Sequence, residues 1–400
     1  MEKIPELLAP AGSFEKLKTA LHFGADAVYL GGKQFSLRAM ADNFTASEMK
    51  EAVSYAHMRG KKVYVTANIF ARDTDFAELA DYFRFIASIG ADAALVTDPG
   101  VFSLAREVTP DLPLHISTQA NVTNARAAAF WQKQGASRVV LARELSLAEI
   151  AKIHAFCPEL ELEAFVHGAM CISYSGRCLL SNYIAGRDSN RGACAQICRW
   201  KFSVRPEGGA EPLSAEEDER GTYIFNSKDL NMLPYLSELA GAGVCSFKIE
   251  GRMKSAYYLA TVVNAYRRAM DGKLDAPSAL QELCKVAHRE YTAAYAFGRN
   301  DETVAYSNSQ AAGTREYVAD VLESGEGDQP ALVQMRGRFR VGDTLEVLSP
   351  YENFDSRFVV GRMTDEAGVP VADAKLVMQK LHLFSPFALR AGDILRRVPV

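Results

Sequence analysis

Short apolar runs recur through the first 250 residues, and each has the length of a strand buried on both faces. Most runs precede a segment with helical spacing of apolar residues, as in Phe14, Leu17 and Leu21, which share one helix face. The phrase FGADAVYL nearly recurs as IGADAALV, which indicates a repeated helix–glycine–strand joint. We therefore predict eight strands, at residues 5–12, 27–32, 62–68, 93–100, 113–119, 138–144, 162–168 and 246–251.

Helix ends are marked along the same region. Thr45 with Glu48, and Ser146 with Glu149, have the spacing of capping boxes, in which each end residue satisfies a free backbone N–H of the other. Glycine, which tolerates the left-handed backbone of a helix end, stands just before the next strand in several places. These positions are Gly24, Gly60, Gly90 and Gly135.

Strands that alternate with helices predict parallel pairing through helical crossovers, the α/β class. Eight such units favour a closed (β/α)8 barrel of the TIM type. An open doubly wound sheet is the alternative. It is less favoured because the segment after the first strand, APAGS, lacks the GxGxxG phosphate-binding pattern.

The rest of the chain departs from this repeat. A cysteine-rich insertion at about 167–225, including a hairpin with an acidic tip, follows the seventh strand and is expected at the C-terminal face, where such barrels carry active sites. Residues 229–243 and 255–270 are predicted as helices. We expect a barrel domain over 1–270, a helical connector over 271–311, and an all-β, barrel-like domain over 312–400.

Composition narrows the class of protein. Apolar residues make up 48% and charged residues 24% of the chain, as in soluble globular proteins. The N-terminus lacks the pattern of a signal peptide, and no apolar run reaches the roughly 20 residues that span a bilayer, so we expect a cytoplasmic protein without membrane contact. The net charge of −4 excludes a polycation, so RNA binding requires a local basic surface.

Four of the seven cysteines stand in one segment, separated by gaps of six, fifteen and three residues. In the cytosol clustered cysteines more often bind metal than form disulfides, although these gaps match neither zinc ribbons nor bacterial ferredoxins. Nearby arginines and a lysine would stabilise thiolates or an anionic cluster. Chemistry alone leaves open a 4Fe-4S cluster, zinc (including a structural zinc loop without catalysis) and unligated thiols. The four are Cys171, Cys178, Cys194 and Cys198, whereas Cys157, Cys245 and Cys284 are predicted to be isolated, buried thiols.

Three stretches together resemble peptidase family U32, the collagenase-like proteases. They are ELLAPAGSFEKLKTALHFGADAVYLGGKQFSLRA, EAFVHGAMCISYSGRCLLSNY and SFKIEGRMKSAYY, and the resemblance covers most of the chain. Residues that fit the family signature are Glu163, Phe165, Gly168, Cys171, Gly176, Cys178 and Ser181.

The resemblance implies a function other than the proteolysis that the family name suggests. Several members are oxygen-independent RNA hydroxylation proteins with a 4Fe-4S cluster. By its length, its RGACAQICRWKF stretch and its C-terminal β-domain, this chain is most similar to the branch that forms 5-hydroxyuridine at the tRNA wobble position with prephenate as co-substrate. For this chain the resemblance implies that Cys171, Cys178, Cys194 and Cys198 hold the cluster, and that tRNA and a small carboxylate are its partners.

Candidate residues for this chemistry stand where the strands are expected to end. Basic groups there would bind carboxylates. Lys248, Glu250 and Arg252 alternate in sequence and are expected on one strand face, although an internal Lys–Glu pair without a catalytic role is the alternative. The expected catalytic set is Arg38, His167, Lys248, Glu250 and Arg252, and the expected substrate-binding set is Asn68, Gln119, Arg143 and Glu144.

In the stretch MRGRFRVGD three arginines alternate with other residues, so we expect them on one face of a strand. They could contact RNA phosphates, or they could be solvated charges that protect a strand edge from aggregation. These are Arg336, Arg338 and Arg340, and Arg396 and Arg397 lie near the C-terminus. Tyr174, Tyr183 and Trp200 are aromatic residues that can stack a base, with core packing favoured for Trp200.

Two other classes of function stay open. A peptidase would use Ser173, Ser175 or Ser181 with His167 as base, but the sequence shows no acidic orienter, no HExxH and no GxSxG. A non-catalytic iron–sulfur or RNA-binding accessory protein is the other alternative.

Overall fold

The computed structural model describes residues 4–37, 42–171, 173–199, 217–218, 221–222, 227–298 and 313–399. The chain divides into two compact units. The first comprises Met1–Leu21, Ala25–Lys254 and Arg289–Gln310, and the second comprises His22–Gly24, Ser255–His288 and Ala311–Val400. The domain limits expected from the sequence stay predictions. Within the described part of the chain, no helix combines the length and apolar character that a bilayer crossing requires.

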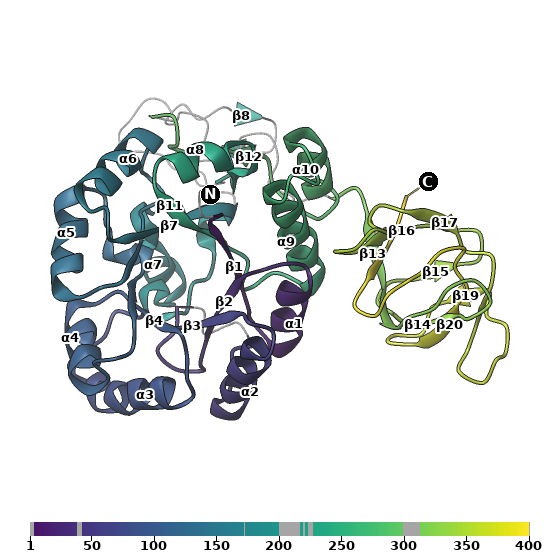
Figure 1. The fold of residues 1–400 in the computed structure, drawn as a ribbon, viewed down its shortest axis with the longest axis horizontal. Coiled ribbons are helices and arrows are strands. Elements are labelled where there is room, and N and C mark those ends of the chain that lie inside the picture. Colours follow the sequence, from purple (N-terminus) through teal and green to yellow (C-terminus); the bar gives the residue numbers. More distant parts are fainter. Residues whose placement is uncertain are drawn as a thin grey trace. The chain divides into compact units, whose positions relative to one another are not determined.

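The first unit is built around a closed parallel barrel (Figure 1). Each strand pairs in parallel with its neighbour, from β1 through β7, and β11 pairs with both β1 and β7, which closes the ring. The predicted (β/α)8 fold is confirmed. The barrel strands are β1 Glu6–Pro10, β2 Ala27–Gly31, β3 Lys62–Ala67, β4 Ala93–Val96, β5 Leu114–Ile116, β6 Arg138–Val140, β7 Glu161–Ala169 and β11 Val244–Ile249.

Helices follow the strands along the chain and surround them (Figure 1). Both predicted capping boxes are present, at Thr45 before α2 and at Ser146 before α6. The four glycines predicted at helix ends all have positive φ, which a residue with a Cβ adopts at a cost. The helices of this unit are α1 Phe14–His22, α2 Ala46–His57, α3 Phe76–Ser88, α4 Pro99–Val108, α5 Ala125–Gln134, α6 Leu147–Phe156, α7 Leu180–Ala185 and α8 Leu236–Gly241.

Two short strands extend the sheet beyond the barrel. β10 (Asp229–Asn231) pairs antiparallel with the last residues of β7, and β12 (Tyr291–Thr292) pairs with β10. The predicted single helix over 229–243 is therefore wrong, and α8 covers only its second half. The reason is tertiary: β7 runs past the barrel and offers free backbone groups, which Asp229 to Asn231 satisfy.

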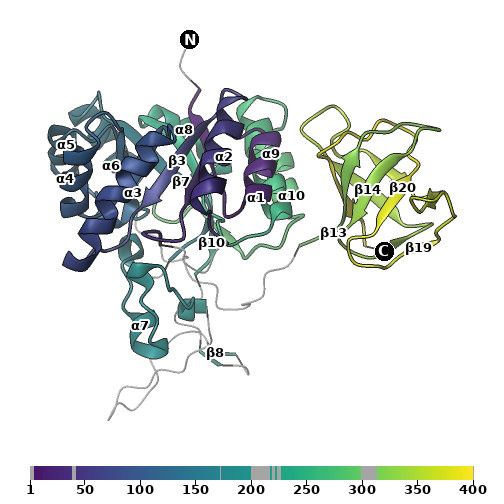
Figure 2. The ribbon, with the colours of Figure 1, turned by 90° about the horizontal axis from the view of Figure 1, so that it is seen from below.

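The cysteine segment lies after β7. It contains α7 and three short 3-10 turns at Tyr174–Gly176, Ser189–Arg191 and Ile197–Arg199. Figure 2 shows α7 beyond one end of the barrel strands. Farther along the predicted hairpin, β8 (Glu217–Asp218) pairs antiparallel with β9 (Gly221–Thr222), and the neighbouring residues 200–216 lie outside the described part.

The second unit combines two helices with an antiparallel β-domain. Its main sheet has the order β17-β16-β21-β13-β14-β20-β18, and β15 pairs with β19 beside it. Leu345, Val347, Leu381 and Leu395 are fully buried in its core. The predicted all-β C-terminal domain is confirmed. The elements are α9 Ala256–Met270, α10 Ala276–Leu283, β13 Glu316–Glu323, β14 Ala331–Met335, β15 Phe339–Arg340, β16 Thr344–Leu348, β17 Arg357–Val359, β18 Met363–Thr364, β19 Asp373–Ala374, β20 Lys380–Leu383 and β21 Ile394–Arg397.

The segment predicted as a helical connector, 271–311, is helical only in its first part. α10 ends at Leu283, and residues 299–312 lie outside the described part. The carbonyls of Cys284 and Lys285 accept hydrogen bonds from the N–H groups of Thr314 and Arg315. The backbone after α10 is thus paired with a distant segment, which replaces the hydrogen bonds that a longer helix would form.

Candidate active site at the barrel mouth

A small cavity of about 50 Å³ lies at the carboxyl ends of the barrel strands. Tyr29, Thr66 and Phe165 form part of its wall. Six of the nine residues predicted for catalysis or substrate binding also line it: Asn68, Gln119, Arg143, Lys248, Glu250 and Arg252. We call this the mouth cavity. Glu144 and His167 do not line it, and Arg38 lies outside the described residues.

Lys248 forms a buried ion pair with Glu163, not with Glu250. Its Nζ lies 2.7 Å from Oε1 of Glu163, which is fully buried on β7. The ammonium also lies 4.5 Å from the ring centroid of Tyr29. Because opposite charge and an aromatic face surround the ammonium, its position at the cavity wall is fixed.

Glu163 belongs to a chain of charges through the barrel interior. Its Oε2 lies 3.0 Å from Arg138, whose guanidinium also lies 2.7 Å from Glu6. Tyr64 donates a hydrogen bond of 2.7 Å to Glu6. Burial alone would raise the pKa of Glu163, but the charges of Lys248 and Arg138 outweigh it and hold that pKa at about 2. We call Lys248, Glu163, Arg138 and Glu6 the barrel ion chain.

The prediction that Lys248, Glu250 and Arg252 share one strand face is wrong. β11 ends at Ile249, so the alternation of side chains does not continue to Glu250 and Arg252. Glu250 accepts a hydrogen bond of 3.2 Å from the hydroxyl of Tyr29. The Arg252 side chain is buried and donates to Asn43 and Thr66. The three nevertheless meet at the mouth cavity, since loops after the strand turn the last two toward it.

The substrate-binding candidates divide into two groups. Asn68 donates to Ser117, and Ser117 donates to Gln119, so these side chains form one hydrogen-bonded row along the cavity wall. Arg143 donates to the carbonyl of Ala169 and lies over the ring of Phe165.

Glu144 and His167 hold structure together instead. Oε1 of Glu144 accepts a hydrogen bond of 2.8 Å from the backbone N–H of Ser175, in the cysteine segment. His167 is buried, with its ring 5.5 Å from that of Tyr291. Its backbone carbonyl accepts from the N–H of Glu250, so it joins β7 to the loop that carries Glu250.

A second cavity, of about 260 Å³, lies beside the cysteine segment. Cys171, Cys194 and Cys198 line this cysteine cavity. Arg143 and Glu250 line both cavities. The same two charged side chains therefore border the predicted ligands and the barrel mouth, which sequence reasoning did not anticipate.

Cys178 is buried and is held separately from the cavity wall. Burial raises the pKa of its thiol, but hydrogen bonds from Ser173 and from the N–H groups of Ser181 and Leu180 outweigh burial, so the pKa is lowered. Ser189 and Asn190 donate to the Cys178 carbonyl at 2.6 Å and 3.0 Å. These bonds tie the part of the segment with Cys171 and Cys178 to the part with Cys194 and Cys198.

The cysteine cavity leaves room for a metal group between three of the four thiols. Four thiolates on a tetrahedral zinc at about 2.3 Å lie roughly 4 Å apart. Within the described residues, the potential ligand atoms found within 4.8 Å of one another belong to three carboxylates rather than to cysteines. A cubane with an iron at each of four corners spaces its ligands more widely, and the cysteine cavity provides the volume between three of them.

The loops after β3 and β5 also anchor the cysteine segment to the barrel. Ser175, fully buried and with a positive φ of 51°, donates to Asn121, itself left-handed at φ 60°. Arg177 donates to the carbonyl of Gln119 at 2.6 Å. Arg191 forms an ion pair with Asp75 at 2.8 Å. Sequence reasoning missed these contacts, because each joins a segment residue to a loop more than 50 positions away.

The arginines predicted for RNA do not share one strand face. β14 ends at Met335, so Arg336 and Arg338 lie in the turn before β15. Arg336 pairs with Asp320 at 2.6 Å and Arg338 pairs with Asp373 at 2.6 Å. Arg340 is exposed and lies 3.8 Å from Asp343. Their contact with RNA stays a prediction.

Arg396 is fully buried, so the reading of it as a phosphate contact is wrong. It pairs with Glu346 at 2.7 Å and with Glu282. Arg397 is partly exposed and pairs with Glu316.

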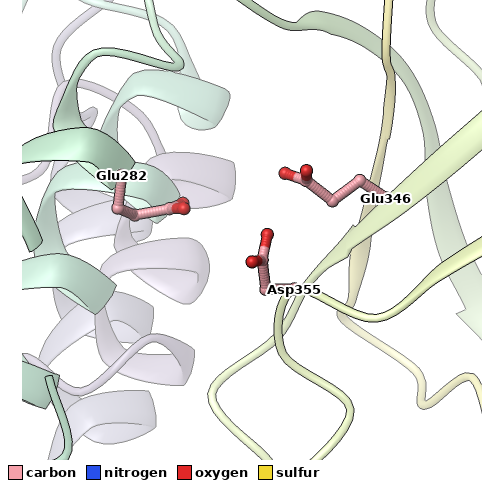
Figure 3. Close-up of side chains that lie close together, drawn as sticks. All are labelled: Glu282, Glu346 and Asp355. Atoms are coloured by element: carbon pink, nitrogen blue, oxygen red, sulfur yellow. The ribbon is translucent and has the colours of Figure 1, made fainter. Parts of the chain in front are cut away.

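Glu282 of α10, Glu346 of β16 and Asp355 point toward one another (Figure 3), an arrangement that resembles a cation site. The ammonium of Lys285 already lies 2.9, 2.8 and 2.6 Å from oxygens of Glu282, Glu346 and Asp355. Arg315 and Arg357 also pair with Glu346. We call Glu282, Glu346, Asp355, Lys285 and Arg396 the closed ion cluster, because its own cations neutralise its carboxylates.

Known proteins resemble this chain over most of its length. Residues 12–305 match the model of peptidase family U32, and residues 314–396 match the model of the U32 C-terminal domain. A Bacillus subtilis relative named tRNA hydroxylation protein P1 is 41% identical, over 88% of this chain and 85% of the relative. The Escherichia coli tRNA hydroxylation protein P is 37% identical, over 92% of this chain and 91% of its own.

A third relative is named for a different RNA. The Escherichia coli 23S rRNA 5-hydroxycytidine C2501 synthase is 36% identical over 68% of this chain and 40% of the synthase. This chain belongs to peptidase family U32.

Proposed function

We propose that this chain is an RNA hydroxylation enzyme that forms 5-hydroxyuridine at the wobble position of tRNA. Two relatives that match most of its length are named for tRNA hydroxylation, and one that matches 68% of it is named for an rRNA 5-hydroxycytidine. Both names describe hydroxylation of RNA, and the second specifies a cytidine. The observation that carries the proposal is the adjacency of the cysteine cavity and the mouth cavity, which share Arg143 and Glu250.

The four clustered cysteines would hold a 4Fe-4S cluster. Three of them border a single cavity, and the fourth, Cys178, is placed among hydrogen-bond donors that favour the thiolate, the form that ligates iron. When bound, the cluster supplies one-electron redox chemistry beside the barrel mouth. Arg187 donates to the carbonyls of Ala193 and Cys194, which keeps positive charge close to an anionic cluster.

The mouth cavity suits a carboxylate group of a co-substrate such as prephenate. Its charged lining consists of three cations, Arg143, Lys248 and Arg252, and one carboxylate, Glu250. Lys248 and Arg252 are already held by buried partners, so they present fixed charge without reorganisation when an anion binds. The mouth cavity is the smaller of the two, so it would receive the carboxyl group, and the larger cysteine cavity next to it would receive the rest of the molecule.

A peptidase is the second candidate that the family name raises, and the geometry gives it less support. The hydroxyl of Ser175 donates to Asn121, and that of Ser181 accepts from the N–H of Ala195. Both hydroxyls are buried in bonds that hold the cysteine segment. A serine nucleophile requires a hydroxyl that reaches substrate and a base beside it, whereas His167 is buried on β7 with its ring 5.5 Å from that of Tyr291.

Nucleoside analysis tests the proposal. The chain, purified without oxygen, is incubated with prephenate and tRNA that lacks 5-hydroxyuridine, and the digested tRNA is examined by mass spectrometry. We expect 5-hydroxyuridine with the wild type and none with Cys171→Ala. Cys245→Ala is the matched control, since Cys245 lies on β11 away from the segment. Cleavage of peptides by both cysteine variants, without hydroxylation by the wild type, would contradict the proposal.

A further inference from the structure

The cysteine segment displays large apolar and aromatic side chains at its surface. Leu179 is 74% exposed, Tyr183 is 91% exposed, and Tyr174 is 54% exposed. The N–H of Tyr183 bonds to the carbonyl of Leu179, so these two residues lie one helical turn apart on the same face of α7. A soluble protein seldom leaves such side chains together in water unless they contact something else.

This exposed face belongs to an ordered element. Ser181, on the opposite side of α7, is buried and accepts a hydrogen bond of 2.9 Å from the N–H of Ala195. Gly186 ends the helix with a left-handed φ of 63°, and the N–H of Arg187 bonds back to the carbonyl of Ser181. The helix is therefore fixed from behind, and its outer face is presented rigidly.

We infer that Tyr183 and Leu179 form a platform on which an unpaired base of the RNA substrate stacks. The inference rests on the proposed function and adds a contact surface to it. Aromatic rings stack on any base through its π-face, which is the common way proteins hold single-stranded RNA. Ser181, on the other side of α7, accepts a hydrogen bond from Ala195, the neighbour of Cys194, which lines the cysteine cavity, so the platform lies about one helix width from a part of the cavity wall.

Local charge favours RNA over other occupants. Residues 171–198 contain three arginines and one aspartate, in a chain whose net charge is −4. Arg177 is exposed beside the 3-10 turn that carries Tyr174. Positive charge interleaved with exposed tyrosine suits a polyanion that carries aromatic bases. A second protein or an anionic membrane would also be drawn by the charge, but neither requires an aromatic ring at position 183.

The test compares two substitutions at one position. Tyr183→Leu keeps an apolar side chain and removes stacking, whereas Tyr183→Trp keeps stacking. Because the side chain is almost fully exposed, neither change removes buried packing. Phe130→Leu, on α5, is the control, since Phe130 is an aromatic residue 52% exposed on a different face. Iron per chain is measured for each variant, so that only intact protein is compared.

Binding is measured by fluorescence anisotropy with an RNA hairpin whose single-stranded loop contains uridine, and with the same stem as a full duplex. We expect Tyr183→Leu to raise the Kd for the hairpin by about 5- to 100-fold, the value of one stacked base. Tyr183→Trp and Phe130→Leu should bind as the wild type does, and the duplex should show no dependence on residue 183.

Three results would overturn the inference. They are an unchanged hairpin Kd in Tyr183→Leu, an equal loss for hairpin and duplex, and wild-type protein that binds phosphatidylglycerol vesicles or self-associates through this face in preference to RNA. If the wild type hydroxylates tRNA and Tyr183→Leu binds normally, the platform alone is refuted. If the wild type neither binds the hairpin nor hydroxylates tRNA, the proposed function fails with it.

Discussion

The barrel ion chain and the closed ion cluster both bury carboxylates among cations. They differ in whether one of the cations also lines a cavity. In the second unit, Lys285 lies within 2.9 Å of oxygens from all three carboxylates, and Arg396 is fully buried beside it. In the barrel, Lys248 satisfies Glu163 on one side and lines the mouth cavity on the other. The cations of the closed ion cluster pair with its own carboxylates, whereas the barrel ion chain extends to the wall of the mouth cavity.

This difference separates two uses of buried charge. A buried ion pair adds little net stability, because desolvation offsets the attraction, but removal of one partner is costly. The closed ion cluster therefore fixes how α10 lies against the β-domain. The barrel ion chain fixes the position of the Lys248 side chain at the mouth cavity, where we propose that a substrate anion binds. Burial alone does not distinguish them; contact with a cavity does.

The largest expected effect is on the stability of the closed ion cluster. Lys285→Met removes three ion pairs at once. Arg396 still pairs with Glu282 and Glu346, but Asp355 loses its pair with Lys285, and we expect the free energy of unfolding to fall by about 3–5 kcal/mol. Urea unfolding followed by fluorescence measures it. Hydroxylation per folded molecule should not change, and a loss of hydroxylation without loss of stability would contradict the comparison.

Lys248→Met should reduce hydroxylation strongly and stability only moderately. Arg138 still neutralises Glu163, so we expect a stability loss of about 1–3 kcal/mol, smaller than that of Lys285→Met. Hydroxylation should fall by roughly 100-fold or more, because a preorganised charge at the site is lost. Steady-state assays with varied prephenate measure this effect. Equal activity of Lys248→Met and the wild type would refute a role for Lys248 at the mouth cavity.

The stability of the barrel is expected to depend on pH through a buried histidine. Burial, and then the charge of Arg138, lower the pKa of His115 from 6.5 to about 3. Below pH 6.5 the unfolded chain binds a proton at this residue that the folded chain does not, so the free energy of unfolding falls as pH decreases toward 3. Between pH 6.5 and 5 the loss is about 2 kcal/mol.

His115→Gln should remove this slope, which urea unfolding at several pH values measures. The low pKa values of Glu163 and Glu346, both about 2, add a further loss that begins only below pH about 4.5. A wild-type slope that His115→Gln leaves unchanged between pH 6.5 and 5 would exclude His115 as its source.

The smallest effect is expected at Arg338. Its side chain is 65% exposed and its pair with Asp373 lies at the surface, so Arg338→Ala should leave the midpoint of urea unfolding close to that of the wild type. As a phosphate contact, its loss would weaken tRNA binding a few-fold and reduce the salt dependence by about one ion. Anisotropy at several salt concentrations measures this dependence, and an unchanged slope would remove Arg338 from the RNA surface.

The sequence predicted the barrel well because its signals are local. Capping at Thr45 and Ser146 and the glycines before strands depend on neighbours within a few positions, and the structure confirms them. Six candidates at the mouth cavity followed from the same reasoning, since strand ends converge at one face.

The remaining features depend on distant partners. Lys248 pairs with Glu163, 85 positions away, and Arg396 pairs with Glu282, 114 positions away. Alternation suggested that Lys248 and Glu250 act on one face, but it does not reveal where β11 ends. The reading of Arg396 as a phosphate contact failed for the same reason, because its partner Glu346 lies on the neighbouring strand β16.

The account depends most directly on the cluster in the cysteine segment. We would measure iron and acid-labile sulfide per chain after purification without oxygen, for the wild type, Cys171→Ala and Cys245→Ala. The account predicts about four of each in the wild type and in Cys245→Ala, and a loss in Cys171→Ala. Zinc in place of iron, or no metal in any of the three, would contradict it.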